Sequence, residues 1–122
     1  MAWLQDEEPA ATLFQALLEK AQRRESELVL SAINAGEIYY LLAKRCGPQV
    51  AAGFRKRLPA MPVRLDVPTE QDIWAAADLK SQYPLSYADA FAAALALSGD
   101  CALLTGDPEF EQIAELKVRW LR

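Results

Sequence analysis

The sequence lacks histidine altogether. This absence excludes catalytic triads and dyads that depend on imidazole, and it removes the histidine ligands that zinc sites favour. Any catalysis must therefore depend on carboxylates. Clusters of carboxylates suit hard cations such as Mg²⁺ or Mn²⁺, which supply the Lewis acidity that histidine cannot.

Cysteine is scarce and the apolar runs are short. Cys46 and Cys101 have apolar neighbours, so we expect buried, reduced thiols rather than a disulfide. No apolar run reaches the ~18 residues that indicate a membrane span. The acidic start from Met1 to Glu8 is unlike a signal peptide, which predicts a cytoplasmic protein with no membrane contact.

The charge of the chain gives no overall attraction to a polyanion, because the net value is −4. Any contact with nucleic acid must come from local basic groups. Two groups are candidates for phosphate contacts: Lys44 with Arg45, and Arg55 with Lys56 and Arg57. An ordinary solvated face is the alternative for each residue, because lysine and arginine are common on protein surfaces.

At 122 residues the chain is expected to form one domain, residues 1–122. Strands alternate with helices, which predicts an α/β fold with a mostly parallel sheet covered on both faces. We expect Asn34, Thr69 and Asp107 to cap helices. The expected helices are 9–24, 34–43, 49–58, 69–82, a buried alanine-rich helix 86–97 and a short helix after 107, and the expected strands are 27–33, 63–67, 101–105 and 117–121.

Three acids occupy similar positions in this pattern. Glu37 and Asp89 fall in the first turns of helices, and Asp107 directly follows a strand. Helix N-termini favour negative charge, and parallel strands end at one edge of the sheet, so the three carboxylates are expected to converge. Two carboxylates ~4 Å apart repel by roughly 4 kcal/mol at an effective dielectric constant near 20, which favours a cation between them. A Mg²⁺ or Mn²⁺ ion at this position suits phosphodiester hydrolysis.

A structural role is the alternative for each acid taken alone. Asp107 is a standard cap before Pro108, and Ser86 with Asp89 matches a capping box. Glu37 is harder to explain in this way, although a glutamate in a first turn also interacts well with the helix dipole.

Three segments, in their order and spacing, carry a family resemblance. They are Ser31–Tyr39 (SAINAGEIY), Leu85–Ala96 (LSYADAFAAALA) and Leu103–Phe110 (LLTGDPEF). Together they resemble the motifs of the PIN-domain family, with toxins of the VapC type as the most similar subgroup. The resemblance covers nearly the whole chain and implies a three-layer α/β/α fold with a mostly parallel sheet. It outweighs the capping interpretation of the acids.

The resemblance also implies roles for individual residues. Glu37, Asp89 and Asp107 match the catalytic, metal-binding acids of the family. Supporting positions are matched by Thr105, a hydroxyl residue before the last acid, by Glu109, a secondary acid, and less specifically by Ser31 and Asn34. The implied activity is Mg²⁺- or Mn²⁺-dependent endonucleolytic cleavage of RNA by the toxin of a type II toxin–antitoxin pair. The implied partners are a cognate antitoxin and a second copy of the chain in a homodimer.

The chain departs from the family at its start. PIN domains usually begin with a short apolar strand that ends in Asp followed by Thr or Ser, whereas Asp6 matches a loop position. We therefore expect the central first strand, and one acidic ligand with it, to be missing. A misassigned start or a truncation is the favoured explanation, ahead of closure of the sheet by rearrangement or by a partner chain, and of a degenerate protein.

Two functions therefore compete. The leading hypothesis is a metal-dependent endoribonuclease that contacts RNA through the two basic groups. The alternative is an inactive or truncated module that binds an antitoxin or dimerises without turnover, because loss of one carboxylate weakens the charge compensation of the metal. An unrelated phosphate-binding α/β protein is less favoured, since the sequence has no Gly-rich phosphate loop.

Overall fold

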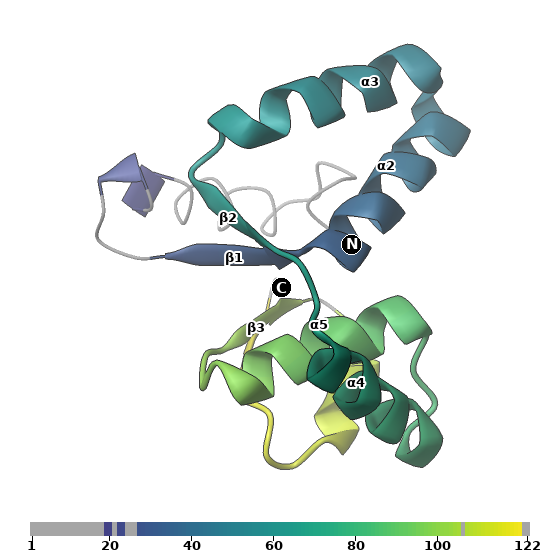
Figure 1. The fold of residues 1–122 in the computed structure, drawn as a ribbon, viewed down its shortest axis with the longest axis vertical. Helices are drawn as coiled ribbons and strands as arrows, with labels where there is room; N and C mark the ends of the chain where they lie inside the picture. The colour runs from purple at the N-terminus through teal and green to yellow at the C-terminus, as the bar shows by residue number, and fades with distance from the viewer. Residues whose placement is uncertain (1–18, 21, 24–26, 106, 121–122) are drawn as a thin grey trace.

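The computed structural model describes residues 19–20, 22–23, 27–105 and 107–120 (Figure 1). Strands and helices alternate along the chain, as expected for an α/β fold. The helix expected over 9–24 lies almost wholly outside the described residues. The elements are β1 (Leu28–Ser31), α2 (Ala32–Cys46), α3 (Pro48–Arg57), the 3₁₀ helix η2 (Leu58–Ala60), β2 (Val63–Asp66), α4 (Glu70–Gln82), α5 (Tyr87–Ser98), β3 (Leu103–Thr105), the 3₁₀ helix η3 (Pro108–Gln112) and β4 (Val118–Trp120).

The four strands form two parallel pairs. β1 pairs with β2, with Leu28 opposite Val63 and Ser31 opposite Asp66, and β3 pairs with β4. No strand in the described part of the chain joins β1 to β3. In the described residues β1–β2 and β3–β4 are thus two separate two-stranded sheets.

Helices cover the strands on both sides. α2 packs against α3, α4 packs against α5, and β1 and β2 lie between these two helix pairs (Figure 1). α5 contacts both β1 and β3, so it packs against both strand pairs. This arrangement confirms the expected three-layer α/β/α fold.

Helix α2 begins earlier than the sequence indicated. Ser31 caps it, because its hydroxyl oxygen accepts a hydrogen bond from the Ile33 N–H at 3.2 Å. The expected cap at Asn34 is therefore wrong: Ser31 has the extended backbone of a cap, and Asn34 lies inside the helix. Glu37 consequently falls in the second turn of α2 rather than the first, which contains no acid.

Three other caps are confirmed. Thr69 and Asp72 form a reciprocal capping box at the start of α4, with distances of 3.2 and 2.8 Å. The Ser86 hydroxyl oxygen accepts from the Asp89 N–H at 3.1 Å. The Asp107 carboxylate accepts from the Glu109 N–H at 2.9 Å and opens η3. Short-range side-chain contacts of this kind stabilise helix starts by about 1 kcal/mol each.

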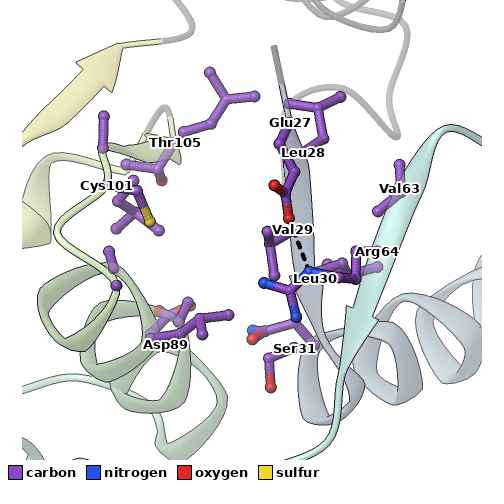
Figure 2. A pocket seen from close by; sticks show the side chains of 18 of the residues that line it. Glu27, Leu28, Val29, Leu30, Ser31, Val63, Arg64, Asp89, Cys101 and Thr105 are labelled. Atoms are coloured by element: carbon purple, nitrogen blue, oxygen red, sulfur yellow. Dashed lines mark hydrogen bonds and ion pairs between the residues drawn. The ribbon is translucent and has the colours of Figure 1, made fainter. Parts of the chain in front are cut away.

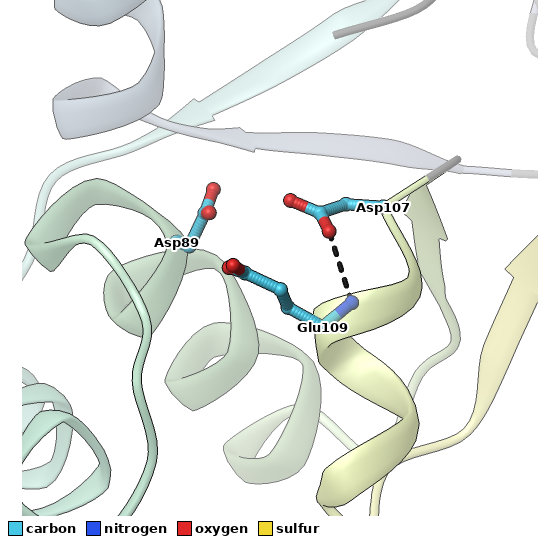
Figure 3. A group of neighbouring side chains, drawn as sticks. All are labelled: Asp89, Asp107 and Glu109. Carbon is cyan, nitrogen blue, oxygen red and sulfur yellow. Dashed lines mark hydrogen bonds between the residues drawn. The ribbon is translucent and has the colours of Figure 1, made fainter.

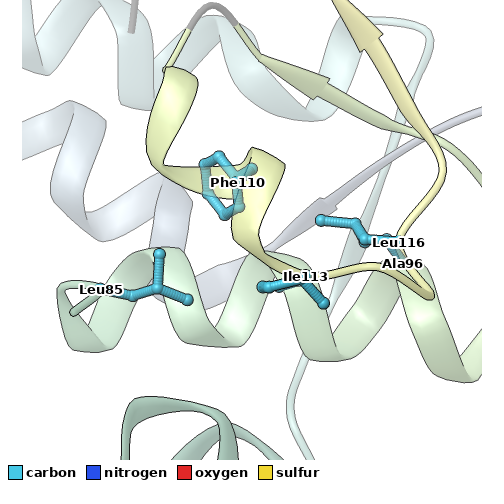
Figure 4. Packing of buried hydrophobic residues seen from close by; sticks show 6 residues of the cluster. Leu85, Ala96, Phe110, Ile113 and Leu116 are labelled. Carbon is cyan, nitrogen blue, oxygen red and sulfur yellow. The ribbon is translucent and has the colours of Figure 1, made fainter. Parts of the chain in front are cut away.

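The expected buried helix is α5. Five of its twelve residues are buried, including Ala93 and Ala96. Phe110 of η3 packs against α5 together with Leu85, Ile113 and Leu116 (Figure 4). Phe110 is only 3% exposed. Its packing holds η3 against α5, and this keeps Asp107 and Glu109 near Asp89 in the first turn of α5.

The cysteines differ from expectation. Both are free, as expected, but both are exposed rather than buried. Cys46 is the last residue of α2 and Cys101 follows the turn after α5, so neither lies in the middle of a packed helix or strand. Among the described residues, no helix combines the length and apolar character that a membrane span requires.

Candidate metal centre

Three carboxylates converge where β3 ends and α5 begins. One oxygen of each of Asp89, Asp107 and Glu109 lies within 4.8 Å of the others (Figure 3). Asp89 and Asp107 are partly buried and Glu109 is exposed. No other set of three acids or cysteines in the described part of the chain lies this close together.

Asp107 serves as a helix cap and also faces the cluster. One of its oxygens accepts from the Glu109 N–H at 2.9 Å, while the other points toward Asp89 (Figure 3). Its own N–H donates to the hydroxyl oxygen of Thr105 at 3.0 Å. The capping role and a metal-binding role are therefore compatible, because they use different oxygens of the same carboxylate.

Asp89 is held in an environment that disfavours its charge. Burial raises the pKa of its carboxyl group, and the negative charge on Asp107 raises it further, whereas a hydrogen bond with Ser86 lowers it. The repulsion between two acids so close together is the electrostatic signature of a site that a cation would stabilise.

Glu37 lies outside the group of three but close to it. Burial raises the pKa of its carboxyl group, and the charge on Asp89 adds to this effect. The carboxylate expected from α2 is thus near enough to Asp89 to interact electrostatically. Glu109, expected as a secondary acid, instead lies within the group, and the only sequence signal for this was its position two residues after Asp107.

Ser31 and Asn34 are the two buried polar residues of the described chain, with exposures of 3% and 5%. The Asn34 Nδ2 atom donates to the carbonyl oxygen of Ala88 at 3.0 Å. Its Oδ1 atom has no hydrogen-bond partner among the described residues. Sequence reasoning missed this link between α2 and α5, because no local pattern marks it.

The two basic groups lie away from the acids. Lys44 and Arg45 occupy the last turn of the 15-residue helix α2, so at 1.5 Å per residue they are ~20 Å from the end of the helix next to β1. Arg55, Lys56 and Arg57 form the last turn of α3, ahead of the amino end of β2. The structure brings neither group to the acidic edge.

A cavity of about 410 Å³ lies between β1 and β3. Figure 2 shows side chains of β1 on one side, with Asp89 and Thr105 across from them. Ser31, Asn34 and Asp89 lie on its wall. Of the three clustered acids, Asp89 lines this cavity.

Comparisons with known proteins agree with the fold. A crystal structure of VapBC2 from Rickettsia felis bound to a DNA fragment from their promoter is similar, with a TM-score of 0.68 and 14% sequence identity. The match covers 87% of this chain and 82% of that chain. No curated protein matches the chain.

The family model of the PIN domain matches residues 1–116. This range includes all three segments on which the resemblance was based, and the expected family is confirmed. The chain belongs to the PIN domain family.

Proposed function

We propose that this protein is a divalent-metal-dependent endoribonuclease, the toxin of a type II toxin–antitoxin pair. The observation that carries the proposal is the convergence of Asp89, Asp107 and Glu109, whose oxygens lie within 4.8 Å of one another. Membership of the PIN domain family supports a hydrolytic nuclease. RNA as the substrate rests on the resemblance to VapC-type toxins.

The chemistry of the donors fits Mg²⁺ or Mn²⁺. All three side chains offer carboxylate oxygens, and hard divalent cations prefer such ligands. The charge of Asp107 raises the pKa of Asp89, and a cation would remove this repulsion. When bound, such a metal supplies Lewis acidity and lowers the pKa of a water molecule.

The protein side chains have distinct roles in this proposal. Asp89 and Asp107 hold the metal and Glu109 completes the group of three. Glu37 of α2 lies outside the group of three but interacts electrostatically with Asp89, and it would act at the same centre as a further acid. Thr105, Ser31 and Asn34 are positioning residues: Thr105 accepts from the Asp107 N–H, and Asn34 donates to the residue before Asp89.

An Asp107→Asn variant tests the site with little structural change. Asparagine caps helices as well as aspartate does, so η3 should stay intact while one charge is lost. We expect RNA cleavage to require Mg²⁺ or Mn²⁺, to stop in EDTA, and to fall in the variant by more than the 10–100-fold typical of an outer-shell change. Asp78→Asn, on the exposed face of α4, is the matched control and should cleave normally. Cleavage that persists in EDTA would exclude the proposal.

A second function is favoured by a different observation. Glu37 lies outside the group of three, and a cavity separates β1 from β3 beside the acids. These features suit a PIN module that binds partners without turnover. If Mn²⁺ raises the unfolding temperature but no RNA is cleaved at any metal concentration, this second function is the correct one.

The proposed partners are a cognate antitoxin and a second copy of the chain. The similar structure is of VapBC2 bound to a promoter fragment. Near the junction of β2 and α4, Val67 is 72% and Trp74 63% exposed, and exposed apolar side chains of this size are typical of contact surfaces. A Trp74→Glu variant should shift a dimer toward monomer in light scattering. An unchanged mass would remove this surface from the dimer interface.

A further inference from the structure

An exposed tyrosine lies beside the candidate metal centre. Tyr87 is the first residue of α5, two positions before Asp89, and is 44% exposed. Its ring packs against that of Phe91 one turn later, with 5.0 Å between the ring centroids and 35° between the planes. Phe91 is only 7% exposed and packs with Ala76 of α4. The core therefore holds the Tyr87 ring in place while part of the residue faces solvent.

Tyr87 and Asp89 leave the first turn of α5 on different sides. Two residues along a helix rise only ~3 Å but turn by roughly 200°. The Asp89 carboxylate faces Asp107 and Glu109 (Figure 3). Tyr87 shares its side of the helix with Phe91, which packs against α4. Tyr87 is therefore near the metal centre but outside it, where a nucleotide that adjoins the reacting phosphate can reach it.

A cation is fixed at the same end of α5. The Lys80 ammonium of α4 donates a hydrogen bond to the carbonyl oxygen of Leu85 at 3.0 Å, and Leu85 directly precedes the cap residue Ser86. This bond uses one of the three N–H groups of the ammonium, so the remaining two can donate to phosphate oxygens. Four steps of 3.8 Å between Cα atoms keep Leu85 within ~15 Å of Asp89. Sequence patterns did not indicate Lys80, because it is a single lysine outside any basic run.

The ring and the cation lie at one junction between α4 and α5. Lys80 bonds to the loop that leads into α5. The residue before it, Leu79, packs against the cluster that contains Phe91, on which Tyr87 rests. Bases of single-stranded RNA stack on aromatic rings, and lysine binds phosphate. A ring that is already fixed loses little conformational freedom when a base stacks on it. The junction thus offers contacts for both parts of a nucleotide.

We propose that Tyr87 and Lys80 form a subsite for one nucleotide next to the cleaved bond of the RNA. The base stacks on the Tyr87 ring, and the phosphate of that nucleotide contacts the Lys80 ammonium. Stacking accepts any base, because every base has a π-face, but the base must be unpaired and free to leave its neighbours. The subsite therefore selects an unpaired base over one inside a helix. This inference rests on the proposed nuclease function and adds to it the residues that hold the RNA beside the acids.

Parallel changes in the protein and in the RNA test the stacking. The probes are short, fluorescein-labelled single-stranded RNAs, intact or with one base removed at a time, and their affinity is measured by anisotropy in EDTA, where the RNA stays intact. We expect Tyr87→Leu to weaken binding of intact RNA about 5-fold or more. Tyr87→Phe keeps the ring and should bind as the wild type does. Circular dichroism checks that both variants fold.

The RNA that lacks the stacked base gives a result that a merely structural role of Tyr87 would not. For this RNA the wild type and Tyr87→Leu should bind equally, because two changes at one contact do not add. In Mn²⁺, Tyr87→Leu should raise KM for intact RNA to the same extent and leave kcat unchanged, since the stacked base does not react.

The salt dependence of RNA binding tests the phosphate contact. Lys80→Gln should reduce the slope of log affinity against log salt by ~0.7, the contribution of one contact with a single strand, and Lys80→Arg should keep the slope. Lys117→Gln is the matched control. The Lys117 ammonium bonds to Asp100 at 3.0 Å, just ahead of the amino end of β4, and its loss should leave the slope unchanged.

Three results would overturn the inference. The first is an effect of Tyr87→Leu that is absent, or that is equal for intact RNA and for every RNA lacking a base, because the ring would then contact no base. The second is an unchanged salt slope in Lys80→Gln. The third is no binding of RNA by the wild type.

These outcomes are distinct from failure of the proposed function. If RNA binds with the expected dependence on Tyr87 and Lys80 but is not cleaved in Mn²⁺, the nuclease activity fails and the subsite stands. If RNA is cleaved and neither variant changes KM or the salt slope, the subsite fails and the nuclease activity stands.

Discussion

The side-chain amide of Asn34 in α2 donates a hydrogen bond to the backbone carbonyl of Ala88 in α5, with 3.0 Å between nitrogen and oxygen. The two residues are 54 positions apart in the chain. Because Ala88 precedes Asp89, the bond connects the helix that carries Glu37 to the helix that carries Asp89. Asn34 is only 5% exposed, so water cannot easily replace the contact.

Replacement of Asn34 should therefore affect both stability and the metal site. We expect Asn34→Leu, similar in size but without the amide, to lower the free energy of unfolding in EDTA by about 1–3 kcal/mol. We also expect a smaller rise in unfolding temperature on addition of Mn²⁺, because Asp89 loses its connection to α2. Urea titration and thermal melts with and without Mn²⁺ measure the two effects. Gln49→Leu, exposed on α3, is the control, and an unchanged Mn²⁺ effect in Asn34→Leu would restrict this residue to a structural role.

The same residue shows where sequence interpretation reaches its limit. Asparagine is a preferred cap residue, so local preference placed Asn34 at the start of the helix. Ser31 takes that role, and Asn34 bonds across the fold to Ala88. A hydrogen bond between residues so distant in sequence leaves no local pattern, and only the packing of α2 against α5 reveals it.

Features that depend on neighbouring residues were predictable. The cap at Asp107 requires only the following proline and the N–H two residues ahead, and it is present. The buried character of α5 follows from alanines on nearly every side of the helix. The exposure of Cys46 and Cys101 was not predictable, because apolar neighbours in sequence do not determine which way the side chain at an element end faces.

Glu109 and Glu37 should differ in their effect on metal affinity. Glu109 lies within the group of three whose oxygens are within 4.8 Å of one another, and Glu37 does not. We expect Glu109→Gln to weaken Mn²⁺ binding in calorimetric titration by about 10-fold or more, and Glu37→Gln to weaken it less. Glu115→Gln, on the exposed chain between η3 and β4, is the control. If Glu37→Gln abolished Mn²⁺ binding and Glu109→Gln left it intact, the ligands would be those implied by the family resemblance rather than by the geometry of the group.

Because the pKa of Asp89 is raised, a rise in pH should destabilise the metal-free protein, whereas a bound metal ion should stabilise it. Burial and the charge of Asp107 raise this pKa above the usual value of aspartate, despite the hydrogen bond with Ser86. A carboxyl group with a higher pKa in the folded state binds protons on folding, so its contribution to stability falls as pH rises from about 3.9 through the folded-state pKa. Above this pH range, the charged Asp89 carboxylate exerts its full destabilising effect on the metal-free protein.

An Asp89→Asn variant separates these effects. In EDTA at pH 8 we expect it to melt about 2–5 °C above the wild type, and the difference should shrink as the pH is lowered toward 4. In Mn²⁺ the order should reverse, since the wild type gains stability from the ion and the variant does not. Differential scanning fluorimetry across pH measures both. A variant less stable than the wild type in EDTA at pH 8 would contradict the repulsion assigned to Asp89 and Asp107.

The two basic groups should influence RNA affinity without changing the rate of cleavage of bound RNA. Lys44 and Arg45 are ~20 Å along α2 from its N-terminal end. Arg55, Lys56 and Arg57 end α3 near the amino end of β2, whereas the acids lie where β3 ends. Contacts at such distances act on the backbone of RNA rather than on its reacting phosphate, and so they are expected to change KM and not kcat.

The salt dependence of binding identifies which group contacts RNA. Neutralising Lys44 and Arg45 together to glutamine should reduce the slope of log affinity against log salt by ~1.4 if both contact phosphates of a single strand, because each contact contributes about 0.7. Neutralising Arg55, Lys56 and Arg57 should reduce it by ~2.1 on the same basis. If neutralising a group leaves the slope unchanged, its residues do not contact RNA phosphates and belong to an ordinary solvated surface. A fall in kcat for either set would instead mean that its cations reach the reacting phosphate, which the distance along α2 and the position of α3 argue against.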